Sequence, residues 1–233
     1  MQYGAGEISQ AQGELAVPEL TLYTYARSSA AFRVRIALNL KGLDYTPLPV
    51  DLLRDGGENW QPDYLAVNPQ GLVPTLMDGR RVVVQTPAIL EYLEERFPDP
   101  PLLPDSARSR AYVRALCAMI SCDVHPLNTL RVMSYLEQRL GASAEQRLEW
   151  YQHWVTQGLD AVEKFLLRHA RYDRFCYGDR PTLADACLVP QVFNAQQYNC
   201  DLTGLPTIRS IYAHCMAQPA FQAAAPDSQP DGG

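Results

Sequence analysis

Residues 25–43, YARSSAAFRVRIALNLKGL, decide how the fold begins, because they combine a helix start, an apolar stripe and a helix stop. Ser28 is a good N-cap, and apolar residues recur every four positions from Phe32 to Leu40. Gly42 supplies the stop. The spacing predicts a helix that begins near Ser28. Its first turn offers unsatisfied N–H groups and the positive end of the helix dipole to an anion.

Two uses of Ser28 stay open on this stretch alone. A serine at a helix start is most often a structural cap, since its hydroxyl satisfies one backbone N–H group. The same hydroxyl, beside the positive end of the dipole, can also stabilise a bound thiolate or another anion. The second use needs support from other parts of the chain.

The composition provides enough apolar material for two compact domains. The chain has 233 residues, 47% of them hydrophobic, and a chain of this size can bury two cores. Its net charge is −6 and its 20 basic residues are dispersed, which argues against a nucleic-acid partner. No apolar run approaches the roughly 20 residues that cross a bilayer, and residues 1–18 lack a signal-peptide pattern. We expect a cytoplasmic protein with no membrane partner.

Cysteine and histidine spacing gives no support for a metal site. The four histidines show neither HExxH nor a paired spacing with cysteine, so we predict no metal. The cysteines lie in the second half without CxxC spacing, mostly in apolar helical patterns, and buried reduced thiols are expected. They are Cys117, Cys122, Cys176, Cys187, Cys200 and Cys215.

The pattern of elements predicts an α/β domain followed by an all-α domain. Residues 1–18 are polar and form an expected loose extension, while strand-like and helix-like runs alternate over residues 19–99 in the order βαβαββα. The proline-rich stretch 98–106 separates this part from an all-helical region, residues 106–226, and residues 227–233 form an expected loose tail. The helical pattern predicts helices over residues 108–124, 126–140, 144–170, 182–198 and 206–217.

Local signals fix several element ends. The Asp78–Gly79 turn predicts a hairpin between two antiparallel strands. Thr86 is the expected N-cap of the following helix, with Pro87 at its first position. Thr182 and Asp185 form a capping-box arrangement that places the start of a buried helix.

Two further positions could serve a ligand or only the fold. Val73-Pro74 precedes the third strand, where an ordinary trans turn proline is the arrangement that the sequence alone favours. A cis bond would instead hold Val73 extended, with its main-chain N–H and C=O free to pair with a peptide-like ligand. Gln85-Thr86 opens the next helix, where the hydroxyl and free N–H groups either cap the helix or hold a carboxylate.

Five segments carry a resemblance to a known family when they are taken together and in order. They are RSSAAFRVRIALNLKGLDY, NPQGLVPTL, QTPAILEYLEERFP, LADACLVPQV and DLTGLPTI. From Leu20 to about Asp231 the chain resembles the glutathione transferases, and within them the zeta class, the maleylacetoacetate and maleylpyruvate isomerases. The resemblance implies a thioredoxin-like glutathione-binding domain over residues 19–99, a helical substrate-site domain over residues 106–226, glutathione as the cofactor, and a homodimer.

The resemblance also implies roles for individual residues. The implied catalytic residues are Arg27, Ser28 and Ser29, with the Ser28 hydroxyl facing the glutathione sulfur. The implied glutathione ligands are Ser28, Val73, Pro74, Gln85, Thr86 and His125. The implied substrate ligands are Arg27, Arg131 and Gln197.

The chain departs from the family pattern at two positions. Ala30 stands where the family has a cysteine after two serines, so that cysteine is dispensable here. CDVHPLN followed by Arg131 looks more like the bacterial maleylpyruvate isomerase branch, in which His125 and Arg131 would line the ligand cleft. Gln197 stands where the family usually has an arginine, and the usual diacid is expected to bind less tightly because glutamine carries no charge.

Arg33 and Arg35 are the other cations of the first helix. They point to different helix faces, so at most one is expected to reach the cleft. We expect both on the solvated surface or in an ion pair at the domain interface.

Three functions follow in order of preference. The first is a glutathione-dependent cis–trans isomerase that converts a maleyl keto acid to its fumaryl isomer and regenerates glutathione. The second is a transferase with conjugating, peroxidase or dehalogenase activity, which would consume glutathione. The third is a non-catalytic glutathione- or ligand-binding protein, since a fold does not fix a function.

Overall fold

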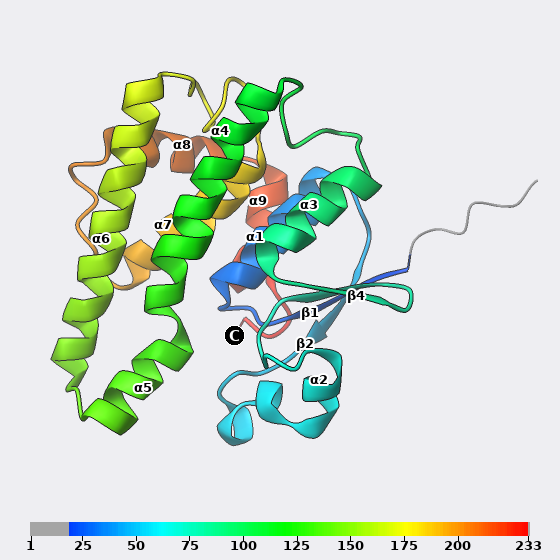
Figure 1. The fold of residues 1–233 in the computed structure, drawn as a ribbon, viewed down its shortest axis with the longest axis vertical. Coiled ribbons are helices and arrows are strands. Elements are labelled where there is room, and N and C mark those ends of the chain that lie inside the picture. Colours follow the sequence, from blue (N-terminus) through cyan, green and yellow to red (C-terminus); the bar gives the residue numbers. More distant parts are fainter. Residues whose placement is uncertain (1–18, 233) are drawn as a thin grey trace, which may run out of the picture.

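The computed structural model describes residues 19–232, and the expected loose extension over residues 1–18 lies outside them. Figure 1 shows α1 and α3 above the sheet and α2 below it, with the long helices α4, α6 and α7 grouped to the left. Within the described part of the chain, no helix has the length and apolar character needed to cross a membrane.

The first half has the predicted order βαβαββα and a thioredoxin-like fold. Its elements are β1 Leu20–Thr24, α1 Ser29–Leu40, β2 Thr46–Pro49, α2 Pro62–Val67, β3 Thr75–Asp78, β4 Arg81–Val84 and α3 Thr86–Arg96. The strands form one sheet in the order β2-β1-β3-β4. β1 pairs with β2 in parallel, and β3 is antiparallel to both β1 and β4. The short turns Arg54–Gly56 and Glu58–Trp60 precede α2.

The helix predicted to begin near Ser28 is α1, and both of its end signals are confirmed. Ser28 is the N-cap, and its Oγ accepts a hydrogen bond from the Ala31 N–H at 3.2 Å. At the other end Gly42 has a φ of 63°, and the Leu43 N–H donates to the Leu38 carbonyl at 3.0 Å. This left-handed turn is the conformation for which glycine is suited.

The expectation that Arg33 and Arg35 are solvated or ion-paired is wrong. Both side chains are buried, with 1% and 0% of their surface exposed. α1 packs against α3 of the first half and also against α7 and α9 of the second half. Because neighbours cover the outer face of α1 as well, the helix leaves no solvated face for these arginines.

The hairpin is confirmed, and the two signals beside it are corrected. Gly79 lies in the turn between β3 and β4 with a φ of 56°. The N-cap of α3 is Gln85, not Thr86, and its side chain makes no capping bond. The Val73–Pro74 peptide bond is cis, whereas the sequence alone favours trans. Tertiary contacts decide the isomer of an X-Pro bond, and local sequence does not contain them.

A buried ion pair ties the linker between the halves to the first half. Lys41 Nζ lies 2.8 Å from a Glu94 carboxylate oxygen, and both side chains are almost fully buried. Lys41 also donates to two linker carbonyls, those of Phe97 and Pro100. The Glu94 carboxylate accepts from two backbone N–H groups further along, at 3.0 Å each. These hydrogen bonds satisfy both charges inside the protein.

The second half is helical. Its elements are α4 Ala107–Ala118, a π-helical turn Met119–Val124, a 3-10 turn His125–Asn128, α5 Leu130–Leu140, α6 Ala144–His169, α7 Leu183–Gln197, α8 Pro206–Met216, α9 Pro219–Ala224 and a 3-10 turn Pro226–Ser228. The predicted helix over residues 108–124 therefore ends earlier as a regular α-helix. Pro126 has no N–H group to donate to a continuing helix, and the chain passes through the 3-10 turn there.

The predicted capping box of α7 is confirmed. Thr182 Oγ1 accepts from the Ala184 N–H, and the Asp185 carboxylate accepts from the Thr182 N–H at 2.7 Å. The same carboxylate accepts from the Cys176 N–H at 2.8 Å. Asp185 thus fixes both the helix start and the loop before it.

The expected loose tail is wrong for residues 227–232, which pack back onto the first half. The Asp231 carboxylate accepts from the Ala26 N–H at 2.9 Å. Two side chains, Ser228 and Gln229, donate to carbonyls of α9. The C-terminus therefore lies beside the start of α1, as Figure 1 also shows.

The thiols follow the expectation with one exception. All six cysteines are free, and five of them are buried. Cys122, on the π-helical turn, is exposed.

Candidate active site

A cavity of about 160 Å³ lies between the two halves and collects most of the implied ligand residues. It is lined by Ala30, Arg33, Asn68, Gln70, Leu72, Val73, Pro74, Gln85, Thr86, Pro87, Ser121, His125, Pro126, Thr129 and Arg131. The implied ligands Val73, Pro74, Gln85, Thr86, His125 and Arg131 are among them. Arg27, Ser28, Ser29 and Gln197 are not.

The start of α1 reaches the cavity through Ala30 and through a contact of Ser29. Ser29 Oγ lies 3.0 Å from His125 Nδ1, so this hydrogen bond joins the two halves at the cavity. Ser28 Oγ accepts from the Ala31 N–H, which leaves the Ser28 O–H free to donate to a ligand. The N–H groups of the first turn add the positive end of the α1 dipole.

Arg27 and Gln197 lie elsewhere. Arg27 is exposed in the turn before α1, and Gln197 is the exposed last residue of α7. Neither side chain lines the cavity, so their substrate roles stay predictions.

His125 is held neutral by its surroundings. Burial of the ring lowers its pKa well below the usual value, and the positive charges of Arg33 and then Arg131 lower it further. A neutral imidazole has one N–H donor and one acceptor nitrogen, and the hydrogen bond with Ser29 uses Nδ1. His125 is therefore an uncharged hydrogen-bonding group at this cavity, while the two arginines carry the positive charge.

The cis bond places the Val73 backbone at the cavity wall. Val73 and Pro74 both line the cavity, directly before β3. The preceding Leu72 carbonyl is held by two donors, Tyr64 Oη at 2.6 Å and Asn68 Nδ2 at 2.8 Å. This anchoring fixes the segment that carries the cis bond.

The N-terminus of α3 forms another wall. Gln85 adopts a φ of 70°, an uncommon value for a residue with a side chain. Its Nε2 donates to Gln70 Oε1 at 2.6 Å. Thr86 follows it, buried, at the first position of the helix, where backbone N–H groups lack helical partners. This wall can hold an anionic group such as a carboxylate.

Several lining residues were missed from sequence. Asn68 and Gln70 lie inside the segment NPQGLVPTL, but uncharged amides carry no signal of their own. Ser121 and Thr129 flank the turn that contains His125, and their position there depends on the change of winding before Pro126. Of Arg33 and Arg35, at most one of which is expected to reach the cleft, Arg33 lines the cavity.

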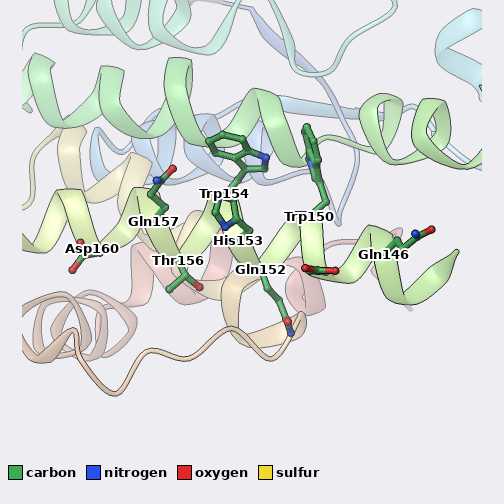
Figure 2. A pocket seen from close by; sticks show the side chains of 9 residues that line it. Gln146, Trp150, Gln152, His153, Trp154, Thr156, Gln157 and Asp160 are labelled. Atoms are coloured by element: carbon green, nitrogen blue, oxygen red, sulfur yellow. The ribbon is translucent and has the colours of Figure 1, made fainter. Parts of the chain in front are cut away.

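A larger hollow, of about 830 Å³, runs along α6 away from these residues. Its lining comes from this one helix, between Gln146 and Asp160. Figure 2 shows Trp150 and Trp154 rising from the same side of the helix. The Trp150 indole donates to the Leu127 carbonyl at 2.8 Å. None of the implied site residues lines this groove.

The comparisons with known proteins agree with the fold. The family model for the glutathione S-transferase N-terminal domain matches residues 22–101. The maleylacetoacetate isomerase of Pseudomonas aeruginosa is 49% identical over 213 residues, which cover 91% of this chain and 98% of the relative.

Two solved structures are similar over almost the whole chain. A holo structure of a bacterial zeta-class maleylpyruvate isomerase has a TM-score of 0.88 at 45% identity, covering 91% of this chain and 99% of the other. The maleylacetoacetate isomerase of Methylobacterium extorquens AM1, solved with malonate and glutathione bound, has a TM-score of 0.87 at 41% identity, covering 90% and 98%.

A thioredoxin-like domain joined to a helical domain is the architecture of the glutathione S-transferases. The chain belongs to this family, and within it to the zeta-class maleylacetoacetate and maleylpyruvate isomerases.

Proposed function

We propose that this protein is a glutathione-dependent isomerase that converts a maleyl keto acid, maleylpyruvate or maleylacetoacetate, to its fumaryl isomer. The observation that carries the proposal is the meeting of three features at one site. These are the start of α1, which lines the cavity through Ala30, two residues after Ser28, the cis Val73–Pro74 bond, and the N-terminus of α3 at Thr86. Relatives at 45–49% identity are isomerases of this kind.

The residues at the site fit glutathione, a peptide with two carboxylates and a thiol. The Val73 backbone offers peptide-like pairing, and the N-terminus of α3 offers N–H groups to a carboxylate. When bound, glutathione supplies a thiolate that adds to the cis double bond, permits rotation about the resulting single bond, and then leaves.

The chain's own residues have two tasks in this reaction. The Ser28 hydroxyl and the positive end of the α1 dipole favour the ionised sulfur and lower the pKa of the thiol. Arg131, which lines the cavity, stabilises carboxylate and enolate charge on the substrate. His125 is a neutral hydrogen-bonding group. Its contact with Ser29 helps to fix the position of one half of the molecule relative to the other.

Three finer properties belong to the same proposal. We propose a homodimer, because the family pairs subunits across the two-domain junction. We also propose a cytoplasmic location and a role in the breakdown of aromatic compounds, in keeping with the isomerases to which the chain is similar. The mass in solution, measured by light scattering, tests the first of these.

The experiment offers maleylpyruvate, maleylacetoacetate and a chlorinated aromatic compound to the purified protein and follows both the product and free thiol. Isomerisation with catalytic amounts of glutathione, and no loss of thiol, supports the proposal. Stoichiometric loss of thiol would instead identify a conjugating or dehalogenating transferase. Tight glutathione binding without any conversion would identify a binding protein.

A further inference from the structure

Two arginines of α1, two positions apart, differ in how their charge is satisfied. Arg35 is buried, and its guanidinium is fully engaged: Nε donates to the Ala224 carbonyl, Nη1 to Thr24 Oγ1 and Nη2 to the Ala26 carbonyl, all at 2.9–3.0 Å. Arg35 is therefore a structural residue that joins α1 to β1 and α9.

Arg33 is equally buried, but its guanidinium lacks such partners. Nε and Nη2 are inaccessible and make no hydrogen bond. The ion pairs found among residues 19–232 do not include Arg33. The titratable groups near it are the thiols of Cys187, Cys117 and Cys122, which are weak acceptors, and the neutral ring of His125, which carries no compensating charge. A buried guanidinium without an acceptor is costly, so its position calls for a ligand.

The space beside Arg33 is suited to an anion. Arg33 lines the cavity together with Arg131 and His125, and the lining contains no aspartate or glutamate. The cavity therefore concentrates positive charge in a chain whose net charge is −6. A water molecule could accept from one N–H group, but it would leave the charge uncompensated.

We propose that Arg33 binds a carboxylate of the second substrate, the small acid that shares the cavity with glutathione. A guanidinium presents two parallel N–H groups to a carboxylate, and such a bond is about twice as strong as a neutral one. In this arrangement Arg33 supplies a positive charge to the substrate carboxylate. Gln197, at the exposed end of α7, is uncharged and supplies none. The identity of the acid rests on the proposed function, whereas the carboxylate site itself does not.

The test measures binding of malonate, a small dicarboxylate, to the full-length protein by calorimetry in the presence of saturating glutathione. Malonamide, a neutral analogue of similar shape, is the ligand control. In Arg33→Gln the Kd for malonate rises about tenfold or more, the loss expected for one charge-assisted bond, while the Kd for glutathione changes less than about twofold. Malonamide binds poorly to both proteins.

Arg35→Lys is the matched variant, because it changes a buried arginine of the same helix that is already satisfied. It lowers the melting temperature but leaves the malonate Kd unchanged. A second measurement uses the wild-type protein labelled with ¹⁵N. The Nε–H signal of Arg33, assigned by its absence in Arg33→Lys, shifts on addition of malonate.

Three results would overturn the inference: no malonate binding to the wild type, a folded Arg33→Gln variant that binds malonate as the wild type does, or an Arg33 Nε–H signal that malonate leaves unmoved. Failure of the proposed function looks different. In that case malonate binding depends on Arg33, but no maleyl keto acid is isomerised.

Discussion

Ser29 Oγ and His125 Nδ1 lie 3.0 Å apart and join the first turn of α1 to the helical half of the molecule. The two residues are 96 positions apart in sequence, so their contact fixes the relative position of the two walls of the cavity. The contact also gives His125, a residue implied only by resemblance, a definite structural place.

This hydrogen bond makes a prediction for stability. Ser29→Ala and His125→Ala each break the same bond, so each lowers the free energy of unfolding by about 1 kcal/mol. The double variant then costs less than the sum of the two single variants. Urea unfolding of the four proteins measures the coupling, and strictly additive losses would contradict the contact.

The lowered pKa of His125 predicts a dependence of stability on pH. Because the folded state disfavours the charged imidazole, the unfolded chain binds the proton more readily below its ordinary pKa of 6.5. The fold therefore loses stability as the pH falls below about 6.5. Unfolding measured at pH 7.5 and about 5.5 should show a smaller loss in His125→Asn than in the wild type. Equal losses would show that this histidine is not responsible.

The buried pair Lys41–Glu94 should matter far more than an exposed pair. Glu94→Ala removes one partner, leaves the Lys41 charge buried and frees two backbone N–H groups, so a loss of about 3–5 kcal/mol is expected. The matched control, Asp160→Ala, breaks the exposed pair with Lys164 on α6, for which about 0–1 kcal/mol is expected. Similar losses in both variants would refute the structural role of the linker clamp.

Gly158 allows α6 to pack closely against the turn that carries His125, and a substitution there tests this packing. A Cβ at this position of α6 would clash with Cγ2 of Val124, the residue just before His125. Gly158→Ala should therefore displace the turn, lower the free energy of unfolding by about 1–3 kcal/mol and weaken glutathione binding. Gly204→Ala is the control, since nothing lies within 4 Å of its added Cβ. Glutathione affinity is measured by calorimetric titration. The prediction is wrong if both variants bind glutathione as tightly as the wild type does.

Much of the fold was predictable because its signals are local. Ser28 and Gly42 bound α1, and Thr182 with Asp185 starts α7, through hydrogen bonds within a few residues. The family motifs added the order of the two domains. These signals persist in the structure because tertiary packing agrees with them.

The features that were not predicted depend on contacts between distant segments. The burial of Arg33 follows from the packing of α7 on α1, and that of Arg35 from α9 as well. The cis Val73–Pro74 bond and the left-handed Gln85 are likewise set by their surroundings. The parts of the site that lie at helix ends were therefore predictable. The position of Arg33 in the cavity lining was not, because it depends on packing between distant segments.

The central claim is that the Ser28 hydroxyl, at the start of α1, keeps the sulfur of bound glutathione ionised. The direct measurement is the pH titration of that thiol by thiolate absorbance in the wild type, in Ser28→Ala and in Ser106→Ala, which loses an N-cap serine outside the cavity. The account predicts that the thiol pKa rises by about one unit in Ser28→Ala alone, a change of about 1.4 kcal/mol, with a slower reaction. An unchanged titration in a folded Ser28→Ala variant would contradict it.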